Sequence, residues 1–332
     1  MTHKQTPLGS GFTAASTTTD VLAGIDLTGR HVVITAGHVG LGLETTRALS
    51  AAGASVVVGA RSPERAAAAV ADLPRVEVRG LDLLDPVSVD AFAAGYLDTG
   101  RPLHILVNNA GIMGGPLVRD SRGYEAQFAT NHLGHFQLTH GLLPALRAAS
   151  GARVVELSSW GHHLSNIRWD DPHFDTEDPF DGMVGYGQSK TANVLFAVEL
   201  DRRWSGDGIR GYALHPGGIL GTNLAPWMPE EGWRAMGLID EHGNVVNDPD
   251  RDFKTPAQGA STTVWAATSP LLDGIGGVYL QNNDIAPLED IDEPISIEFG
   301  SGPLQTTVGV TRYAVDPESA QRLWELSEKL TV

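Results

Sequence analysis

Short runs of β-branched residues alternate with longer helical patterns along most of this chain, beginning at about residue 30. This alternation is typical of repeated strand–helix–strand units, which give a parallel sheet with helices on both faces. Strands are predicted at 31–36, 55–60, 75–81, 105–108, 153–157, 209–215 and 277–280. Helices are predicted at 41–52, 63–72, 86–98, 123–149, 188–204 and 256–267. The sequence therefore predicts an α/β fold: one domain with a doubly wound parallel sheet of about seven strands.

The predicted sheet belongs to one central domain with an extension at each end. Residues 1–24 are rich in Thr, Ser, Gly and Ala and are predicted to be an N-terminal extension. Residues 25–287 contain the alternation, and residues 288–332 are predicted to be a C-terminal extension with a terminal helix. Long loops interrupt the alternation at 160–185 and 223–254. Loops of that length are usually lids or binding loops, so both are predicted to cover a site.

Composition narrows the classes of partner. The chain has 332 residues, with 40 Asp and Glu against 23 Lys and Arg, so its formal net charge is −17. That charge repels phosphate backbones, and neither nucleic acid nor a membrane is expected as a partner. No apolar run reaches the ~18 residues of a membrane span and the N-terminus lacks a signal-peptide core, so a cytoplasmic location is expected. The absence of cysteine excludes disulfides, thiolate metal sites and cysteine nucleophiles.

A glycine-rich turn follows the first predicted strand and leads directly into a helix. Backbone N–H groups in such a turn point at a pyrophosphate, and the helix dipole favours its negative charge. Glycines also serve ordinary tight turns, but the position of this turn at the start of a strand–helix series favours a dinucleotide. The candidate binding residues are Gly37, His38, Gly40, Leu41 and Gly42.

The second predicted strand ends at Ala60 and Arg61, with no carboxylate to accept a hydrogen bond from the ribose 2′-hydroxyl of NAD. Arg61 offers a guanidinium to a 2′-phosphate instead, which favours NADP(H) as the cofactor. The alternative is that Arg61 is a solvated side chain at a strand end, since one charge is weak evidence.

Tyr186 and Lys190 lie at the start of a predicted helix, and a spacing of four puts both side chains on one helical face. A phenol with a pKa near ~10 carries protons poorly at neutral pH, but an adjacent ammonium stabilises the phenolate and lowers that pKa. The two residues are therefore a candidate acid/base pair. The same spacing occurs by chance in many helices and has little weight alone.

Several phrases of the sequence, in their order and rough spacing, resemble those of the short-chain dehydrogenase/reductase superfamily. They are 35–42, Asp82-Leu83, Asn108-Asn109-Ala110-Gly111, 130–136, Ser158-Ser159, 186–190 and His215-Pro216-Gly217-Gly218. Within that superfamily, 131–138, 158–162 and 188–200 resemble the retinol dehydrogenase-like branch and its bacterial relatives. The resemblance runs from about Leu27 to about Leu280 and implies a Rossmann-type domain.

The resemblance also implies catalytic roles. Tyr186 is expected to be the general acid/base, and Lys190 to lower the pKa of Tyr186 and hold the nicotinamide ribose. Ser159, the second serine of its pair, is expected to bond the substrate oxygen. Asn131 is expected to complete the tetrad by holding a water in the proton relay to Lys190.

Further residues are implied along a cofactor cleft. They are Asp82 and Leu83 beside the adenine, Asn108 and Gly111 along the cleft, and Pro216, Gly217, Ile219 and Thr222 beside the nicotinamide. Two positions depart from the family pattern. Ala36 replaces a glycine, and an alanine would be strained if the turn needs φ > 0 there, unless Gly37 absorbs the turn. Leu220 and Gly221 separate Thr222 from the preceding motif.

Other chemistries have less support. The histidines His132, His135, His162 and His163 lie inside the family phrases and match no known ligand set, so no metal is expected. Ser159 is not surrounded by the Gly-x-Ser-x-Gly elbow of a hydrolase. Several tryptophans lie on segments expected to ring the cleft, where they either line an aromatic or polycyclic substrate pocket or anchor the loops. They are Trp160, Trp169, Trp227 and Trp233.

The sequence predicts an NADP-dependent oxidoreductase that interconverts a carbonyl and an alcohol on a small hydrophobic or polycyclic substrate. An isomerase, dehydratase or cyclase on the same fold is the alternative, and an NADPH-binding protein without catalytic activity is another. A homo-oligomer is expected, because helices 123–149 and 188–204 resemble those that pair between subunits in the superfamily.

Overall fold

The computed structural model describes residues 5–176, 179–222, 224–296 and 307–331. The remaining positions belong to the two predicted extensions and the two predicted lids, so those parts of the predictions lie outside the described residues.

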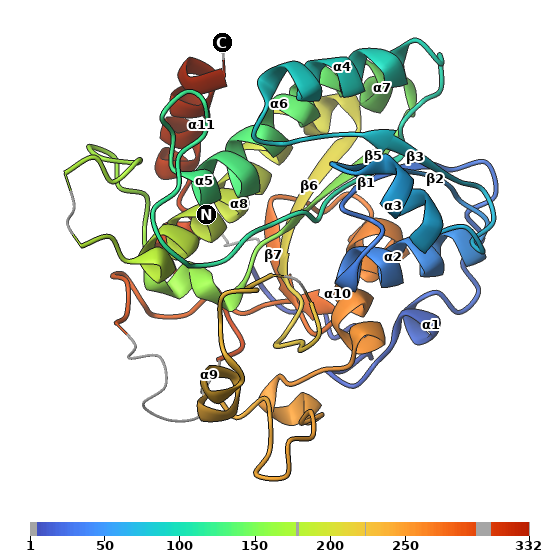
Figure 1. Ribbon diagram of the computed structural model, residues 1–332. Helices are drawn as coiled ribbons and strands as arrows, with labels where there is room; N and C mark the ends of the chain where they lie inside the picture. The colour runs from blue at the N-terminus through green and yellow to red at the C-terminus, as the bar shows by residue number, and fades with distance from the viewer. Residues whose placement is uncertain (1–4, 177–178, 223, 297–306, 332) are drawn as a thin grey trace.

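One sheet of eight strands lies at the centre of the described chain (Figure 1). The strands are β1 (His31–Thr35), β2 (Ser55–Ala60), β3 (Val76–Gly80), β4 (Ile105–Asn108), β5 (Ala152–Leu157), β6 (Ile209–His215), β7 (Val278–Gln281) and β8 (Asp284–Ile285). Their order is β3-β2-β1-β4-β5-β6-β7-β8, and β7 and β8 are the antiparallel pair. The predicted α/β fold with a doubly wound parallel sheet is confirmed, and β8 is the strand that the prediction lacked.

Helices cover both faces of the sheet. They are α1 (Thr18–Val21), α2 (Gly40–Ala51), α3 (Pro63–Ala69), α4 (Pro86–Leu97), α5 (Ala126–Phe128), α6 (Gly134–Gly141), α7 (Leu143–Ala148), α8 (Gly182–Trp204), α9 (Glu230–Ala235), α10 (Pro256–Thr268) and α11 (Pro317–Thr331). Among the described residues, none of these helices is both long enough and apolar enough to cross a membrane.

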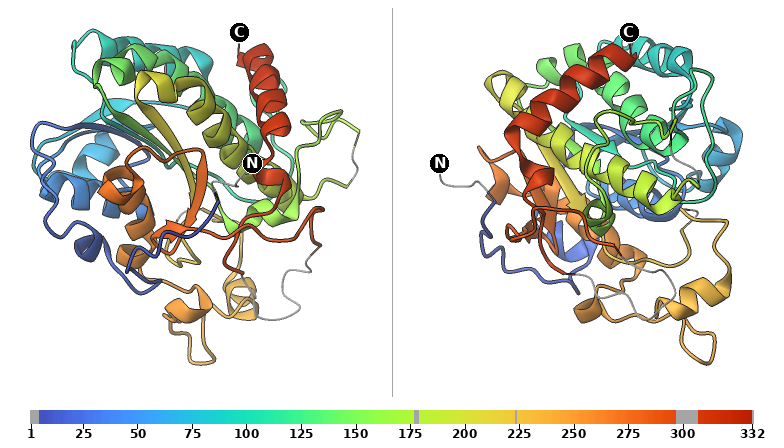
Figure 2. Two further views of the ribbon diagram at one scale, coloured as in Figure 1. Left: turned by 180° about the vertical axis from the view of Figure 1, so that it is seen from behind. Right: turned by 90° about the vertical axis from the view of Figure 1, so that its left-hand side faces the viewer.

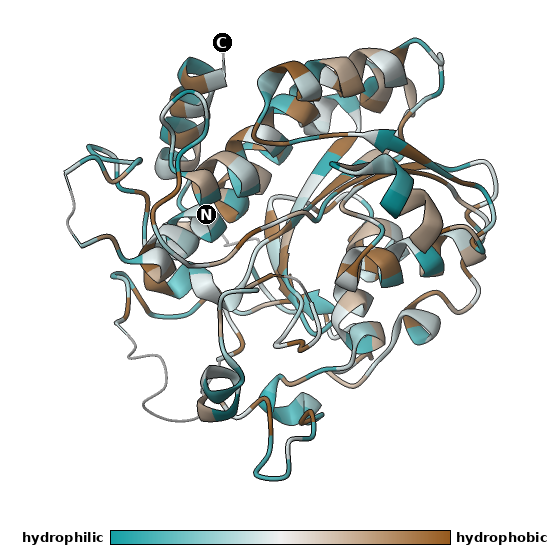
Figure 3. Cartoon of the chain, viewed as in Figure 1, coloured by the Kyte–Doolittle hydropathy of each residue, from teal (hydrophilic) through white to brown (hydrophobic). Residues whose placement is uncertain are grey.

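Alternate residues of the buried strands pack on opposite faces of the sheet, as strand geometry requires. Val32 and Ile34 of β1 belong to a core with Trp265 of α10, whereas Val33 belongs to a core with Phe196 of α8. Figure 3 shows apolar residues on the strands and on the helices that cover them. Because both faces are covered, polar groups of the strands can form a site only at the strand ends.

The segment predicted as one helix at 123–149 is divided. Between α5 and α6, residues Ala129–Leu133 form a π-helical turn that contains Asn131. After α6, Pro144 lies in the first turn of α7 and cannot donate the hydrogen bond that would continue the preceding helix. π-helical turns are frequent at functional sites, and this one turns Asn131 toward α8.

Helix α8 begins at Gly182, six residues before the predicted start at 188. The Asp181 carboxylate caps it by accepting hydrogen bonds from the N–H groups of Met183 and Val184. Tyr186 therefore lies in a formed helical turn and not at a helix start, which fixes its orientation relative to Lys190.

Both extensions are held against the domain. The Gln5 amide donates to the carbonyl groups of Tyr279 and Ala286, and the N–H of Leu8 donates to the Asp284 carboxylate. At the other end of the chain, α11 lies against α8 in the views of Figures 1 and 2.

Helix α11 also covers the face that the predicted oligomer would use. Trp324 of α11 contacts the rings of Phe136 in α6 and of Phe196 and Trp204 in α8. His132 is hydrogen-bonded to Ser327 of α11 at 2.7 Å. The homo-oligomer prediction relied on helices 123–149 and 188–204. Helices α6 and α8, which correspond to them, thus bury apolar side chains against α11 of the same chain.

Candidate active site

A cleft lies at the carboxyl ends of β1, β4, β5 and β6, where the order of the strands reverses. Its cavity has a volume of about 260 Å³ and is lined by the glycine-rich turn, the strand ends, α8 and the 223–254 loop. The predicted residues that line it are Gly40, Leu41, Gly42, Gly111, Ser159, Tyr186, Lys190, Pro216, Gly217, Ile219 and Thr222. The predicted residues Gly37, His38, Leu83, Asn108 and Asn131 are outside this lining set.

The glycine-rich turn leaves the amino end of α2 open to an anion. Val39 precedes the helix without a side-chain cap, and the first turn of α2 contains no acidic residue. A Cβ at Gly37 would lie 2.7 Å from Thr46 Oγ1 and 2.9 Å from Val58 Cγ2, so only glycine lets α2 pack this closely on β2. The uncapped N–H groups and the close backbone approach fit the pyrophosphate of a dinucleotide.

Ala36 has a φ of 54°, in the left-handed region, and its N–H donates to the Gly59 carbonyl at 2.8 Å. Gly37 does not take a positive φ, so the strain considered for an alanine at this position is present. The cost is roughly 1–2 kcal/mol for a residue with a Cβ. The turn keeps its path despite the missing glycine.

Thr222 reaches the same turn across the two additional residues. A Cβ on Gly40 would lie 3.4 Å from Thr222 Cγ2. Gly221 has a φ of 83°, which lets the chain turn back toward α2. The structure therefore brings Thr222 together with the glycine-rich turn.

Asn108 and Asn109 follow each other at the end of β4 but face different surroundings. Asn108 is 1% exposed, and its Nδ2 donates inward to Glu156 Oε1 at 2.5 Å. Asn109 lines the cleft in the place expected for Asn108. The difference of one position arises because successive residues of a strand point to opposite sides.

Tyr186 lies on the cleft wall and is 4% exposed. Its side chain is hydrogen-bonded to the Ser159 side chain. Burial raises the pKa of Tyr186 to about 12, and the bond to Ser159 opposes that shift. The expected lowering by Lys190 is therefore not found in the free protein, because burial prevails. The phenol keeps its proton at neutral pH.

Lys190 lies behind Tyr186, with its Nζ 5.5 Å from the centre of the Tyr186 ring. The ammonium donates to the Leu157 carbonyl at 2.8 Å and is thereby directed at the strand. Gly111 lies beside this ammonium, since a Cβ on Gly111 would be 3.5 Å from Lys190 Nζ. Burial lowers the pKa of Lys190 to about 8, and the Glu156 carboxylate opposes that shift.

The two adjacent serines have different partners. Ser158 Oγ donates to the Lys190 carbonyl at 2.8 Å and ties β5 to α8. Ser159 Oγ accepts a hydrogen bond from the Gly161 N–H at 3.0 Å, which caps the turn Trp160–Leu164. Ser159 is thus the serine whose hydroxyl lies beside the Tyr186 phenol.

Asn131 joins three segments. Its Oδ1 accepts from the Ile112 N–H at 2.9 Å, and its Nδ2 donates to Ser189 Oγ at 2.9 Å. Its backbone carbonyl accepts from Asn193 Nδ2 at 2.7 Å and is 3.0 Å from His135 Nδ1. A carbonyl oxygen has two lone pairs, so the two protein groups can occupy both lone pairs of the backbone carbonyl, whereas one protein donor is described for Oδ1.

Arg61 and Asp82 line a second hollow, of about 370 Å³, beside β3. Asp82 Oδ1 accepts a hydrogen bond from the Leu84 N–H at 3.0 Å. His38 has a buried Nδ1 without a partner in the described part of the chain, and its pKa is lowered by burial and by Arg65. Sequence reasoning missed Arg65, although its spacing of four from Arg61 could have indicated a second cation at this end.

The cleft wall away from the glycine-rich turn is largely apolar and comes mostly from residues that sequence reasoning did not select. These include Met113, Leu164, Met183, Leu224, Met236, Leu238 and Phe253. Of the predicted tryptophans, Trp160 and Trp233 line the cavity. Trp169 instead stacks under Arg322 of α11, whose guanidinium carbon is 4.3 Å from the ring centre. The signal for this wall was the apolar residues spaced along the two long loops.

A buried charged cluster joins the end of β6 to the end of the 223–254 loop. His215 Nδ1 accepts from the Trp160 N–H at 3.0 Å, so Nε2 carries the proton and donates to Asp252 Oδ2 at 2.7 Å. Lys254 Nζ lies 3.2 Å from Asp252 Oδ1. Burial alone would raise the pKa of Asp252, but His215 and Lys254 lower it to about 2.

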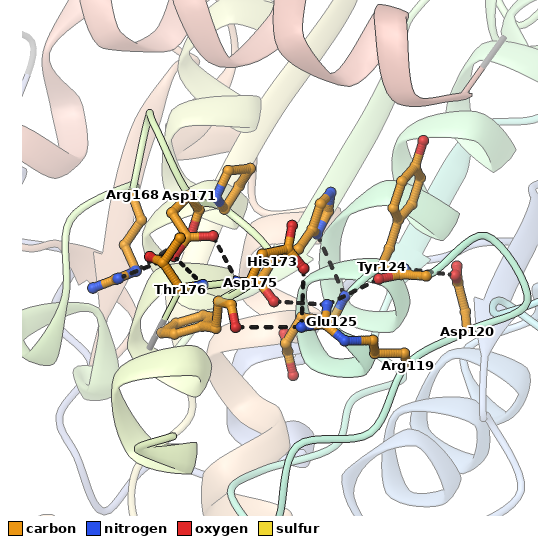
Figure 4. A network of polar contacts seen from close by, with 12 residues as sticks. Arg119, Asp120, Tyr124, Glu125, Arg168, Asp171, His173, Asp175 and Thr176 are labelled. Carbon is orange, nitrogen blue, oxygen red and sulfur yellow. Dashed lines mark hydrogen bonds and ion pairs between the residues drawn. The ribbon is translucent and has the colours of Figure 1, made fainter. Parts of the chain in front are cut away.

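The 160–185 loop is held by a polar network on the outside of the molecule (Figure 4). Arg119 donates to the carbonyl groups of His173 and Phe174 at 2.9 and 3.2 Å and pairs with Asp175 at 3.0 Å. The His173 ring stacks on Tyr124 with the ring centres 4.3 Å apart. In the part of the chain that the structure describes, no group of three or more His, Asp or Glu side chains is placed to hold a metal ion.

Comparisons with known proteins agree with this geometry. A family model for short chain dehydrogenases matches residues 30–170. A probable oxidoreductase of Streptomyces lividans is 47% identical over 91% of this chain and 97% of the relative. Retinol dehydrogenase 12 of Bos taurus is 44% identical over 78% of this chain and 79% of the relative. The crystal structure of an uncharacterized protein from Mycobacterium Paratuberculosis has a TM-score of 0.70 at 34% identity, covering 96% of this chain and 97% of that one.

This chain therefore belongs to the short-chain dehydrogenase/reductase family, as the sequence motifs indicated. It is an oxidoreductase of that family, whose members use a nicotinamide cofactor.

Proposed function

We propose that this protein is an NADP(H)-dependent enzyme that interconverts a carbonyl and an alcohol on a hydrophobic or polycyclic small molecule. One observation carries the proposal. Tyr186, Ser159 and Lys190 converge on one wall of an apolar cleft that ends at the glycine-rich turn. An acid, a polarising hydroxyl and an ammonium beside a dinucleotide site are what carbonyl reduction requires.

The bound nicotinamide would supply the hydride or accept it. The N–H groups at the start of α2 would hold the pyrophosphate, and Lys190 would hold the ribose. In reduction, the Ser159 hydroxyl bonds the carbonyl oxygen, and Tyr186 transfers its proton to that oxygen as the alcohol forms. In oxidation, Tyr186 takes the proton back.

The pH dependence follows from the two buried groups. Reduction needs a protonated Tyr186, and its pKa of about 12 keeps the proton in place through the accessible range. It also needs the Lys190 ammonium, whose pKa is about 8. The rate of reduction should therefore be constant at lower pH and fall as the pH rises through about 8.

Arg61, Arg65 and the unpaired Nδ1 of His38 support a preference for NADP(H). Arg61 directly follows the end of β2, and Arg65 lies four residues further on in α3 and interacts electrostatically with His38. The last residue of β2 is Ala60, which has no carboxylate to bind a ribose hydroxyl instead. A guanidinium forms charge-assisted hydrogen bonds with phosphate oxygens.

The Tyr186→Phe variant tests the function. The substitution removes one oxygen, so folding and NADPH binding should persist, while reduction of an accepted ketone should fall by ~10²–10⁴-fold. NADPH consumption is measured with a panel of aromatic and polycyclic ketones, and NADPH binding by calorimetry. Full turnover by the variant would show that another residue carries the proton. An isomerase, dehydratase or cyclase would convert substrate without net NADPH consumption.

A cytoplasmic location and a homo-oligomer remain predictions. Helix α11 packs against α6 and α8, the helices on which the oligomer prediction relied. Light scattering decides between an oligomer and a particle of 35.2 kDa.

A further inference from the structure

A carboxyl group that the proposed mechanism does not use lies behind the catalytic wall. Glu156 belongs to β5, three residues before Ser159, and its exposed fraction is 0%. Its Oε1 accepts from Asn108 Nδ2 at 2.5 Å, and its Oε2 accepts from Asn193 Nδ2 at 3.4 Å. Residues of β4 and α8 thus hold this carboxyl inside the protein.

The same cluster reaches the catalytic lysine by two routes. Leu157, the residue after Glu156, supplies the carbonyl that accepts from Lys190 Nζ at 2.8 Å. Asn193 lies on α8 three residues after Lys190, and its Nδ2 also donates to the Asn131 carbonyl at 2.7 Å. Glu156 is therefore connected to both the lysine and the asparagine of the proposed tetrad.

The other titratable groups that face Lys190 cannot balance its charge. His135 of α6 has its pKa lowered to about 4, chiefly by burial, and is neutral. Tyr186 keeps its proton. Before the reaction, with Tyr186 protonated, Glu156 is the described carboxyl group that interacts electrostatically with Lys190 and can become an anion.

The hydrogen bonds of the cluster indicate a proton on Glu156. Asn108 Oδ1 and Asn193 Oδ1 are buried without a partner in the described part of the chain, so the cluster is short of donors. Burial raises the pKa of Glu156 to about 8, in agreement with a carboxyl that is protonated at neutral pH.

We propose that Glu156 is a positioning residue for the catalytic lysine: its buried carboxyl group, held by Asn108 and Asn193, keeps the Lys190 ammonium charged inside the protein. As the pH rises, Glu156 loses its proton and leaves a carboxylate near the Lys190 ammonium. Attraction between the two charges favours this state over the one in which Glu156 is protonated and Lys190 is a neutral amine. Lys190 therefore keeps its proton to a higher pH than burial alone would allow. This inference rests on the proposed function, because it gives Glu156 a role in the action of Lys190.

The Glu156→Gln variant tests the inference. It keeps the size of the side chain and one acceptor oxygen but removes the charge, so Lys190 should lose its proton at a lower pH. The descending alkaline limb of kcat/KM for ketone reduction should move down by about one pH unit. The Glu199→Gln variant is the matched control, because Glu199 is equally buried on α8 but pairs with Arg202 and Arg203. The alkaline limb of Glu199→Gln should lie at the same pH as that of the unsubstituted protein.

A purely structural role for Glu156 would lower activity or stability at every pH and leave the limb in place, and that result would overturn the inference. If Glu156→Gln does not fold, infrared difference spectra recorded between neutral and alkaline pH can follow the Glu156 carboxyl directly. They are recorded on the Glu125→Gln variant, because Glu125 is the other buried glutamate with a raised pKa and its signal would overlap. The signal of a buried carboxylic acid should disappear over the pH range in which the rate of reduction declines. Spectra without such a signal would overturn the inference. Full turnover by Tyr186→Phe would overturn the proposed function itself, independently of these results.

Discussion

The two halves of the cleft are built by different parts of the chain. The half proposed to bind the cofactor, called here the cofactor half, consists of short turns that directly follow buried strands, and it offers backbone N–H groups at the start of α2. The half proposed to bind the substrate, called here the substrate half, consists largely of side chains from the two long loops, such as Leu164, Trp233 and Phe253. A site formed by backbone N–H groups depends little on which side chains surround it. A wall formed by loop side chains, in contrast, can change with their sequence without altering the fold.

The two loops of the substrate half are also held differently. The 160–185 loop is fixed by the network around Arg119 that Figure 4 shows. The 223–254 loop is held mainly near its ends: the Trp227 Nε1 donates to the Met113 carbonyl at 2.6 Å, and Asp252 belongs to the buried charged cluster. Between these anchors, Val245 is 60% exposed. We therefore expect the 223–254 loop, and not the 160–185 loop, to be the wall that moves when a substrate enters.

Of the effects that separate the two halves, the largest is expected in the cofactor half. The Arg61→Ala variant should bind NADPH at least tenfold more weakly and NADH almost unchanged, because each lost charge-assisted bond costs about 1.5–3 kcal/mol. Calorimetric titration with both cofactors measures the difference. Arg47→Ala is the control, because Arg47 is a half-exposed arginine of α2 that pairs with Glu44. Equal affinities of the parent protein for NADPH and NADH would contradict the NADP preference.

An intermediate effect is expected in the substrate half. Trp227→Ala removes the hydrogen bond to Met113 and the ring that lies over Gly115, so the 223–254 loop should open. The KM for a ketone should rise about tenfold, while the Kd for NADPH should not change. Steady-state kinetics and calorimetry separate the two constants. Val245→Ala changes the exposed part of the same loop and should leave both unaltered. A parallel loss of NADPH affinity in Trp227→Ala would mean that the two halves are not independent.

The smallest effect concerns stability alone. Ala36→Gly should raise the free energy of unfolding by about 0.5–1 kcal/mol, because relief of the left-handed φ exceeds the entropic cost of a glycine. Ala68→Gly on the exposed face of α3 should lower it by about 1 kcal/mol, because helical φ gives glycine no advantage. Urea unfolding measures both values. A loss of stability in Ala36→Gly would show that the turn is not strained.

Much of the fold was predictable because periodicity and turn residues are local properties. The strands β2, β4 and β6 have the predicted bounds, since each is a short apolar run between clear turn signals. The divided helix at 123–149 was not predictable in the same way. Its π-helical turn depends on bonds from Asn131 to Ile112 and Ser189, which lie far from it in sequence.

The candidate site shows the same division. The motifs named Tyr186, Lys190 and Ser159, and these residues lie together in the structure. They could not indicate which of two adjacent asparagines lines the cleft. Nor could they indicate that burial raises the pKa of Tyr186, where Lys190 was expected to lower it. A pKa depends on the dielectric surroundings and on distances to charges, and neither is written in a local pattern.

The sequence by itself determined the order of the strands and helices, the dinucleotide turn and the residue types of the catalytic wall, because each depends on the period or the chemistry of neighbouring residues. Only the tertiary structure decided that α11 covers the α6 and α8 face, that Thr222 returns to Gly40, and that Glu156 lies behind Lys190. Each of these relations joins residues that are distant along the chain, and packing alone brings them into contact.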